Sequence, residues 1–265
     1  MTVAILGCGY TGTRVAERLL ARGVEVIATS RRPETLTQLS AKGARVIGLD
    51  VDQSADTSLI TNGVSILYSI PQVSPALIRS LDNRPSRIVH LSTTGVYGAI
   101  QDVNHQTMAQ PREGREIERY RQETLVAAGA WSTLTLRAAA IYGPGRGIHV
   151  SMARGEFRLA GDGSNYVSRI HVEDLAALAE AALSSSIAGA YPVGDSDPCR
   201  SIEIANFCSR LLRVPLPQSA EKGELDRSRQ ANRRVDGSQI RRLLSVPLQY
   251  PSYRDGIPAA LDKMV

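Results

Sequence analysis

The chain has 265 residues with 43% hydrophobic and 22% charged side chains, a globular composition that excludes a disordered chain. It lacks an apolar run of the ~20 residues that span a bilayer, and its start lacks the basic segment of a signal peptide, so we expect a cytoplasmic protein with no membrane partner. The net charge of +5 comes from scattered arginines, which argues against nucleic-acid binding. Three cysteines without C-x-x-C spacing suit a reducing compartment and predict neither a disulfide framework nor a metal site.

Apolar strands and amphipathic helices alternate along the chain. The expected strands are Thr2–Leu6, Val24–Thr29, Arg45–Leu49, Val64–Ser69, Arg87–Leu91, Leu134–Ala139 and Ala190–Val193. The expected helices are Thr11–Arg22, Pro33–Gly43, Gly114–Ala128, His171–Ser184, Ser201–Val214 and Gln239–Leu244. This order predicts an α/β fold, a Rossmann doubly wound parallel sheet with helices on both faces.

The regular alternation weakens after Gly143-Pro144-Gly145. We therefore expect residues 1–144, completed by 172–196, to form an NAD(P)-binding Rossmann domain. Residues 145–171 and 197–265 are expected to form a small C-terminal substrate-capping region that packs on the sheet rather than folding alone.

A phosphate-binding turn is predicted at Gly7-Cys8-Gly9-Tyr10-Thr11-Gly12, between the first strand and the first helix. The first glycine permits a tight turn, the second lets the backbone approach a pyrophosphate, and the third lets the helix pack on the strand. The helix N-terminus then offers free N–H groups to the diphosphate. A plain glycine-rich turn is the alternative.

The end of the second strand bears on the choice between NAD and NADP. NAD enzymes usually place an acidic residue there to accept from the ribose hydroxyls. This chain has Ser30-Arg31-Arg32 and no acid until Glu34. Arginine can hold a 2′-phosphate with two parallel hydrogen bonds, so the segment favours NADP as the cofactor and leaves NAD open. The alternative is a solvated helix start.

Four segments together resemble the extended short-chain dehydrogenase/reductase superfamily, which includes the NAD-dependent epimerases and dehydratases. They are the glycine turn, Leu91–Gly98, Leu136-Arg137 with Ile141–Arg146, and Arg169–Leu175. The short length and the late Val235-Asp236-Gly237-Ser238 and Tyr250-Pro251-Ser252 segments resemble the compact YeeZ-type branch of that superfamily.

The resemblance implies roles for further residues. Asp50 would hydrogen-bond the adenine, and Ser69, Ile70 and Pro71 would lie along the cofactor. Thr93 matches the serine or threonine that hydrogen-bonds the reacting oxygen of the substrate, and Ala139–Tyr142 would border the nicotinamide. His171 and Asp174 match a structural motif, where packing and helix capping are expected.

The chain departs from the family at its catalytic pair, a tyrosine followed four residues later by a lysine. Counting back from Glu123, which matches a family glutamate, places Arg115 at the tyrosine position and Arg119 at the lysine position. Arg119 can still hold ribose hydroxyls, but a guanidinium at position 115 stays charged and cannot exchange protons.

Another side chain would then have to act as the acid/base. Tyr97 and Tyr142 are the first candidates, and His149 and Tyr166 are further ones. An ordinary packing or surface role is the alternative for each.

Two functions follow. The first is an atypical NADP-dependent oxidoreductase, epimerase or dehydratase that acts on a small-molecule substrate without the usual pair. The second is a cofactor-binding sensor or regulatory protein without turnover. We expect a monomer or homodimer in either case.

Overall fold

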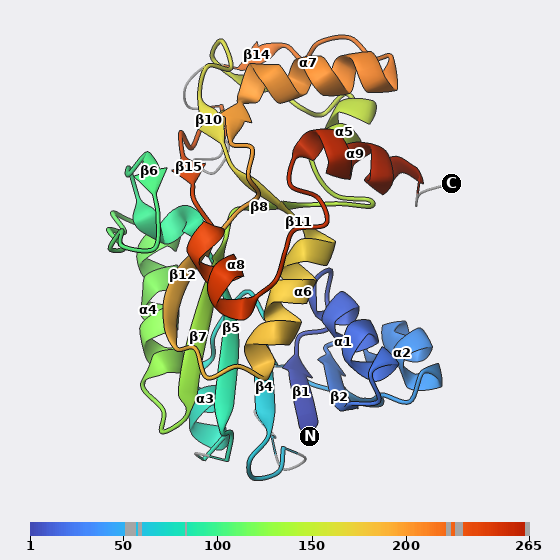
Figure 1. Cartoon of the computed structure of the whole chain (residues 1–265), viewed down its shortest axis with the longest axis vertical. Helices are drawn as coiled ribbons and strands as arrows, with labels where there is room; N and C mark the ends of the chain where they lie inside the picture. The colour runs from blue at the N-terminus through green and yellow to red at the C-terminus, as the bar shows by residue number, and fades with distance from the viewer. Residues whose placement is uncertain (51–56, 58–59, 83, 221–223, 226–229, 263–265) are drawn as a thin grey trace.

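The computed structural model describes residues 1–50, 57, 60–82, 84–220, 224–225 and 230–262. A seven-stranded sheet with strand order β12-β7-β5-β4-β1-β2-β3 forms its centre (Figure 1). The strands are β1 Thr2–Leu6, β2 Glu25–Ser30, β3 Arg45–Gly48, β4 Ser65–Tyr68, β5 Arg87–Thr93, β7 Ser132–Ala138 and β12 Gly189–Val193. Every neighbouring pair is parallel, which confirms the predicted doubly wound Rossmann sheet.

Helices cover both faces of the sheet because its strands are apolar on both sides. One face packs against α1 Gly12–Ala21, α2 Thr37–Ala41, α6 Val172–Leu183 and α8 Ser238–Leu244. The other packs against α3 Pro75–Ser80 and α4 Arg115–Ala127. Two short 3-10 helices, η1 Pro33–Leu36 and η2 Thr94–Tyr97, follow β2 and β5.

A second group of elements gathers beyond the carboxyl ends of the strands (Figure 1). Its helices are α5 Ile148–Ala153, α7 Ser201–Leu212 and α9 Tyr253–Asp262. Its short strands are β8 Ala140–Tyr142, β9 Leu159–Ala160, β10 Tyr166–Val167, β11 Arg169–His171, β13 Cys199–Arg200, β14 Ser219–Ala220 and β15 Arg234–Val235. Strand β6 Asp102–Val103 comes from the sheet half of the chain and pairs with β15. These helices share a small core of their own, which includes Ile204, Cys208, Tyr253 and Ile257.

Helices α3, α5 and α9 were not anticipated from the sequence. Helix α9 contains Gly256 and Pro258, two residues that disfavour helix in isolation. A side chain at Gly256 would collide with the hydroxyl of Tyr142, so this glycine is needed where the helix packs on that ring. Helix α8 lies with the sheet rather than with the other late helices, because Ile240 belongs to the core on that face.

No helix in the described ranges is long and apolar enough to cross a membrane; the longest, α4, has 13 residues. Cys8, Cys199 and Cys208 are all buried, and none forms a disulfide.

Candidate cofactor cleft

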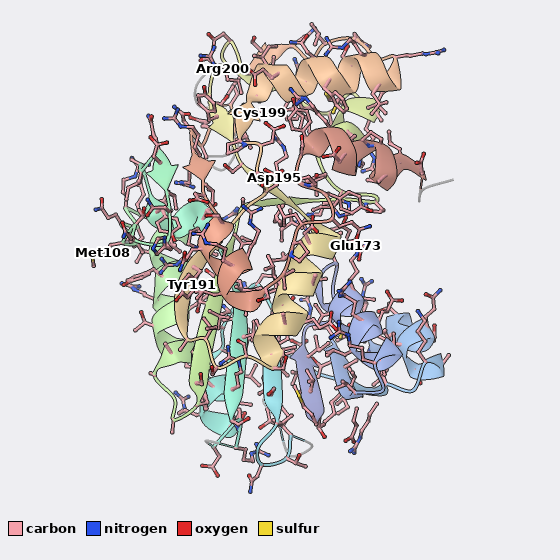
Figure 2. The ribbon with its side chains drawn as sticks, in the orientation of Figure 1. Met108, Glu173, Tyr191, Asp195, Cys199 and Arg200 are labelled. Atoms are coloured by element: carbon pink, nitrogen blue, oxygen red, sulfur yellow. The ribbon has the colours of Figure 1, made fainter. Side chains whose placement is uncertain are left out.

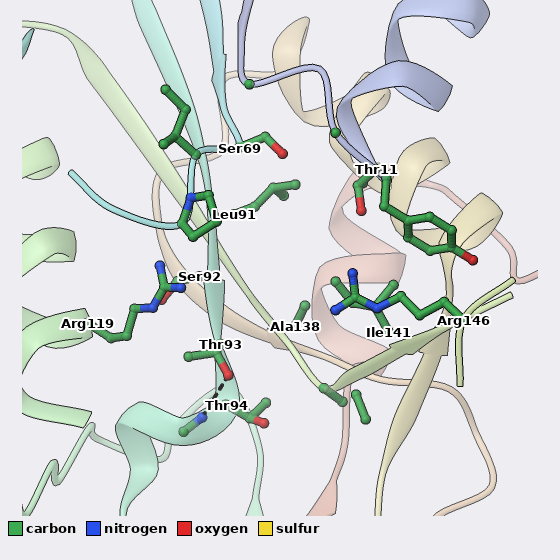
Figure 3. Close-up of a pocket in the computed structure, with 18 of the residues that line it drawn as sticks. Thr11, Ser69, Leu91, Ser92, Thr93, Thr94, Arg119, Ala138, Ile141 and Arg146 are labelled. Atoms are coloured by element: carbon green, nitrogen blue, oxygen red, sulfur yellow. Dashed lines mark hydrogen bonds between the residues drawn. The ribbon is translucent and has the colours of Figure 1, made fainter. Parts of the chain in front are cut away.

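The cleft opens where the strand order reverses. Strand β1 lies between β2 and β4. The chain first adds β2 and β3 on one side of β1 and then crosses back to add β4 and β5 on the other side. The two halves of the sheet therefore part above the carboxyl end of β1, where such folds bind ligands. A cavity of about 910 Å³ occupies this place (Figure 3). Its walls comprise residues 7–11, 29–32, 49, 69–72, 91–95, 119, 138–141, 146, 166–168, 231, 233 and 235. Both the sheet and the elements beyond it therefore contribute to one cleft.

The glycine turn has the shape that a diphosphate requires. Gly7 has a φ of +93°, and a side chain at Gly12 would collide with the carbonyl oxygen of Gly7, so helix and turn meet at the third glycine. Gly9 has nothing within 4 Å of the position where a Cβ would stand. The turn is fixed to β2, because the Gly7 N–H donates to Thr29 Oγ1 over 3.1 Å. An open backbone surface at a helix N-terminus fits the diphosphate of a dinucleotide.

The segment after β2 forms the end of the cleft where the sequence predicts the adenosine part of the cofactor. Ser30, Arg31 and Arg32 all line it, and Ser30 Oγ accepts a hydrogen bond from the Arg32 N–H over 3.1 Å. Both arginines are exposed. Among the described residues, no aspartate or glutamate lines the cleft, and Glu34 lies outside it. The charge of this end is therefore positive.

Most of the predicted site residues meet in this cleft. They are Gly7, Gly9, Tyr10, Thr11, Ser30, Arg31, Arg32, Ser69, Ile70, Pro71, Thr93 and Arg119. Gly12 is not part of the wall, because it packs against the Gly7 carbonyl oxygen at the start of α1. Asp50 directly follows the lining residue Leu49 and is not itself part of the wall, so its contact with adenine stays a prediction.

The opposite end of the cleft is formed where β5 and β7 finish. Thr93 lines it, and its Oγ1 accepts from the Gly95 N–H over 3.2 Å. Arg119 enters from α4, and its Nη1 donates to Gln122 Oε1 over 3.3 Å. Burial, and then the charge of Arg115, lower the pKa of the Arg119 guanidinium. Arg115 itself is exposed and is not part of the wall.

Tyr97, expected as an acid/base, lies in the protein interior. It is fully buried and does not line the cleft. Its hydroxyl accepts from Arg137 Nη1 over 3.2 Å, and Arg137 in turn forms a buried ion pair with Glu123, at 2.7 Å between Nη2 and Oε2. Burial raises the pKa of the Tyr97 phenol. The geometry therefore gives this tyrosine a packing role.

Tyr142, the second expected acid/base, is also turned away from the cleft. Its hydroxyl donates to the carbonyl oxygen of Ser252 over 3.3 Å, and its ring meets that of His171 edge-on at 5.1 Å. Burial raises its pKa strongly, which disfavours a phenolate. The preceding residues Ala139, Ala140 and Ile141 do line the cleft.

The expected structural motif at the start of α6 is confirmed. His171 is the N-cap residue, and its Nδ1 accepts from the Glu173 N–H over 3.2 Å. The Asp174 carboxylate accepts from the N–H groups of Gln249 and Tyr250 over 2.7 and 3.1 Å. Asp174 therefore joins α6 to the segment that leads to α9.

Sequence reasoning missed several lining residues, above all Arg146 and Arg233. Arg146 ends the Ile141–Arg146 segment, so its position in a glycine-rich turn was the available signal. Arg233 follows a stretch without a motif and is brought in only by the fold. Of the two further acid/base candidates, Tyr166 lines the cleft, whereas His149 is fully buried outside it.

Fold and cleft together define a Rossmann protein with the features of a dinucleotide-binding site. A family model described as "NADP oxidoreductase coenzyme F420-dependent" matches residues 2–94, the part of the chain that carries the glycine turn. A "3-diazoavenalumate denitrifying reductase" from a Streptomyces species is 27% identical over 149 residues. That alignment covers 51% of this chain and 49% of the reductase, so the matched part spans about half the length of each.

Two solved structures share the fold over nearly the whole chain. A functionally unknown conserved protein from Silicibacter pomeroyi has a TM-score of 0.84 at 28% identity, covering 99% of this chain and 98% of that one. The UDP-glucuronic acid 4-epimerase from Bacillus cereus, in complex with UDP-glucuronic acid and NAD, has a TM-score of 0.82 at 15% identity, covering 100% and 99%. The second likeness concerns the fold alone.

Proposed function

We propose that this chain is an NADP-dependent oxidoreductase of the epimerase and dehydratase type, from the compact YeeZ-type branch, that works without the usual tyrosine and lysine pair. The observation that carries the proposal is the cleft itself. The glycine turn at residues 7–12 leaves its backbone open to the cleft, and the exposed Arg31 and Arg32 line the same cleft. None of the described wall residues has a carboxylate side chain. NADPH, when bound, supplies a hydride.

The preference for NADP rests on charge. A 2′-phosphate beside Arg31 and Arg32 would gain charge-assisted hydrogen bonds, and the Ser30 hydroxyl could add another. NAD presents only ribose hydroxyls at that position, for which a carboxylate is the usual partner. The sequence match to an NADP oxidoreductase model over residues 2–94 supports the same choice.

Calorimetric titration of NADP and NAD tests this assignment. Replacing Arg31 and Arg32 by alanine is expected to weaken NADP binding by about 1–3 kcal/mol and to leave NAD binding unchanged. Arg45→Ala is the matched control, because Arg45 is exposed and stands at the amino end of β3, outside the cleft wall. Equal weakening of both cofactors in the double variant would contradict a 2′-phosphate site.

For catalysis, Thr93 would orient the reacting oxygen of the substrate, since its hydroxyl lies in the cleft wall at the end of β5. Arg119 would hold the ribose on the nicotinamide side. At the ends of β5 and β7, the described wall residues offer hydroxyl groups and a guanidinium but no carboxylate, imidazole or lysine amine. Of the acid/base candidates, only Tyr166 is among the described wall residues, so any proton would come from its phenol, from water or from the substrate itself.

That same composition supports a second candidate, a cofactor-binding sensor without turnover. A screen of NADPH oxidation against carbonyl compounds and sugar nucleotides separates the two. Turnover with any substrate supports the enzyme. NADPH binding in the micromolar range without turnover across the whole screen would favour the sensor.

A further inference from the structure

Two arginines face the nicotinamide end of the cleft from different walls. Arg119 comes from α4, beside the ends of β5 and β7, and Arg146 comes from the turn after β8. Figure 3 shows their guanidinium groups entering the cleft from opposite sides. The two side chains are therefore placed to address one ligand from two directions.

Arg146 is held in place by the phosphate-binding turn. Gly143 and Arg146 exchange two backbone hydrogen bonds, at 2.9 and 3.0 Å, which close a tight turn around Pro144. The Tyr10 hydroxyl donates to the Pro144 carbonyl oxygen over 3.0 Å. The guanidinium carbon of Arg146 lies 5.3 Å from the centre of the Tyr10 ring, within range of a cation–π interaction. The position of this charge is therefore tied to the glycine turn.

Neither guanidinium has an ion-pair partner within 4 Å among the described residues. Other arginines of the same fold do: Arg14 pairs with Glu173, Arg18 with Glu180 and Arg137 with Glu123. The lowered pKa of Arg119 reflects surroundings that disfavour its charged form. A negatively charged ligand between Arg119 and Arg146 would relieve this cost.

NADP has two anionic groups, and the proposed function assigns both of them. The 2′-phosphate would lie at Arg31 and Arg32, and the diphosphate would lie at the glycine turn. The cleft therefore has a third positive region whose charge no anionic group of the cofactor neutralises, although Arg119 would also contact the uncharged ribose hydroxyls. Arg233 also lines it but is already occupied, since it donates to the carbonyl oxygens of Gly98 and Ile100.

We propose that Arg119 and Arg146 form an oxyanion site that holds a carboxylate or phosphate group of the substrate beside the nicotinamide. The inference rests on the proposed function and names its substrate class, a small acid whose anionic group lies close to the reacting carbon. Guanidinium groups suit this task because each can donate two parallel hydrogen bonds to such an anion. Thr93, in the same wall, would then receive the reacting oxygen.

The test uses the full chain saturated with NADP, so that both cofactor sites are filled. Oxalate and inorganic phosphate are titrated separately by calorimetry at constant ionic strength. Both probes are expected to bind, and Arg119→Gln and Arg146→Gln are each expected to weaken that binding by about tenfold or more. Arg154→Gln is the matched control, because it removes an exposed charge at the end of α5, outside the cleft, and should leave both probes unaffected. A preference for one probe identifies the carboxylate or the phosphate.

NADP affinity is measured in the same variants and keeps the two proposals apart. Arg146→Gln is expected to change NADP affinity by less than about threefold. A loss of tenfold or more in NADP affinity, with unchanged anion binding, would place Arg146 on the cofactor diphosphate and overturn the proposal. Absence of anion binding to the NADP-saturated chain would also overturn it. Failure of NADP itself to bind would instead reject the proposed function, and that result is visible before any anion is added.

Discussion

The two ends of the cleft are built in different ways. The adenine and diphosphate end comes from consecutive pieces of chain, the turn after β1 and the segment after β2, within the first 32 residues. The nicotinamide end is assembled from β5, α4, β7, the turn around Pro144 and residues beyond 165. The first end keeps the features of a dinucleotide site. At the second end, Arg115 and Arg119 stand at the two positions where the family resemblance places a catalytic tyrosine and lysine.

This contrast separates binding from chemistry. A diphosphate is held by backbone N–H groups, so its site depends on glycine positions and on a helix N-terminus more than on particular side chains. Proton transfer depends on the side chains that reach the reacting atoms. Cofactor binding and catalytic chemistry can therefore change independently, and variants that affect one end should leave the other intact.

The largest effect is expected from the ion pair beneath the nicotinamide end. Arg137 and Glu123 are both almost fully buried, at 9% and 6% side-chain exposure, so Glu123→Leu leaves an uncompensated guanidinium in the interior. We expect a loss of about 3–5 kcal/mol in the free energy of unfolding, measured by urea denaturation. NADP affinity of the folded fraction should persist. Glu17→Ala, which breaks an exposed pair with Lys42, is the control and should cost less than about 1 kcal/mol. Similar losses in both variants would contradict the buried role.

Gly9→Val, at the diphosphate end, should lower NADP affinity and leave the stability of the fold nearly unchanged. Because nothing lies within 4 Å of a Cβ at Gly9, the free energy of unfolding should change by less than about 1 kcal/mol. The new side chain would occupy the place of the diphosphate, so NADP affinity should fall by roughly 100-fold or more, about 2.7 kcal/mol. Calorimetry and thermal unfolding measure the two quantities. Gly12→Val, whose side chain would collide with the Gly7 carbonyl oxygen, should instead lower both stability and NADP affinity. If Gly9→Val bound NADP as tightly as the natural chain, the assignment of the turn to the diphosphate would be wrong.

A pH-dependent effect is expected where the sheet meets the late helices, at Asp195 (Figure 2). Burial, the largest cause, raises the pKa of its carboxyl from 3.8 to about 7, against opposing charges from Arg169 and Arg241. The folded chain thus binds this proton more tightly than the unfolded chain, and stability from this group is lost as pH rises from about 4 to about 7. Asp195→Asn should therefore stabilise the fold by about 1–3 kcal/mol at pH 8 and by less at pH 4.5. An equal difference at both pH values would contradict the raised pKa.

The smallest effects are expected for Tyr97→Phe and Tyr142→Phe. Each removes one hydrogen bond, to Arg137 or to the Ser252 carbonyl, and should lower stability by about 0.5–1.5 kcal/mol. Neither phenol lines the cleft, so kcat for any substrate found in the NADPH screen should stay within about twofold, on the order of 0.4 kcal/mol. A large fall in kcat with unchanged stability would contradict this prediction and would support an acid/base role for the tyrosine.

Much of the fold was predictable because its signals are local. Strand β1 was predicted at its observed bounds, and helices α1, α4, α6 and α7 within two residues at each end. Apolar periodicity marks these elements, and flanking glycines also mark α1 and α4. The site was predictable in part. Residues 7–11 and 30–32 lie in the cleft as expected, but Arg146 and Arg233 were missed because their approach depends on elements distant in sequence.

The sequence by itself determined the parallel sheet and the phosphate-binding turn, because both follow from short-range patterns of apolar residues and glycines. It also determined that no tyrosine and lysine stand in the usual catalytic spacing. Only the tertiary structure decided which side chains reach the nicotinamide end. Tyr97 faces the buried Arg137 and Glu123 pair, and Tyr142 packs on Gly256 of α9. The physical reason is that the direction of a side chain on a strand end is fixed by what packs against it, and those partners lie as many as 114 residues away in the sequence.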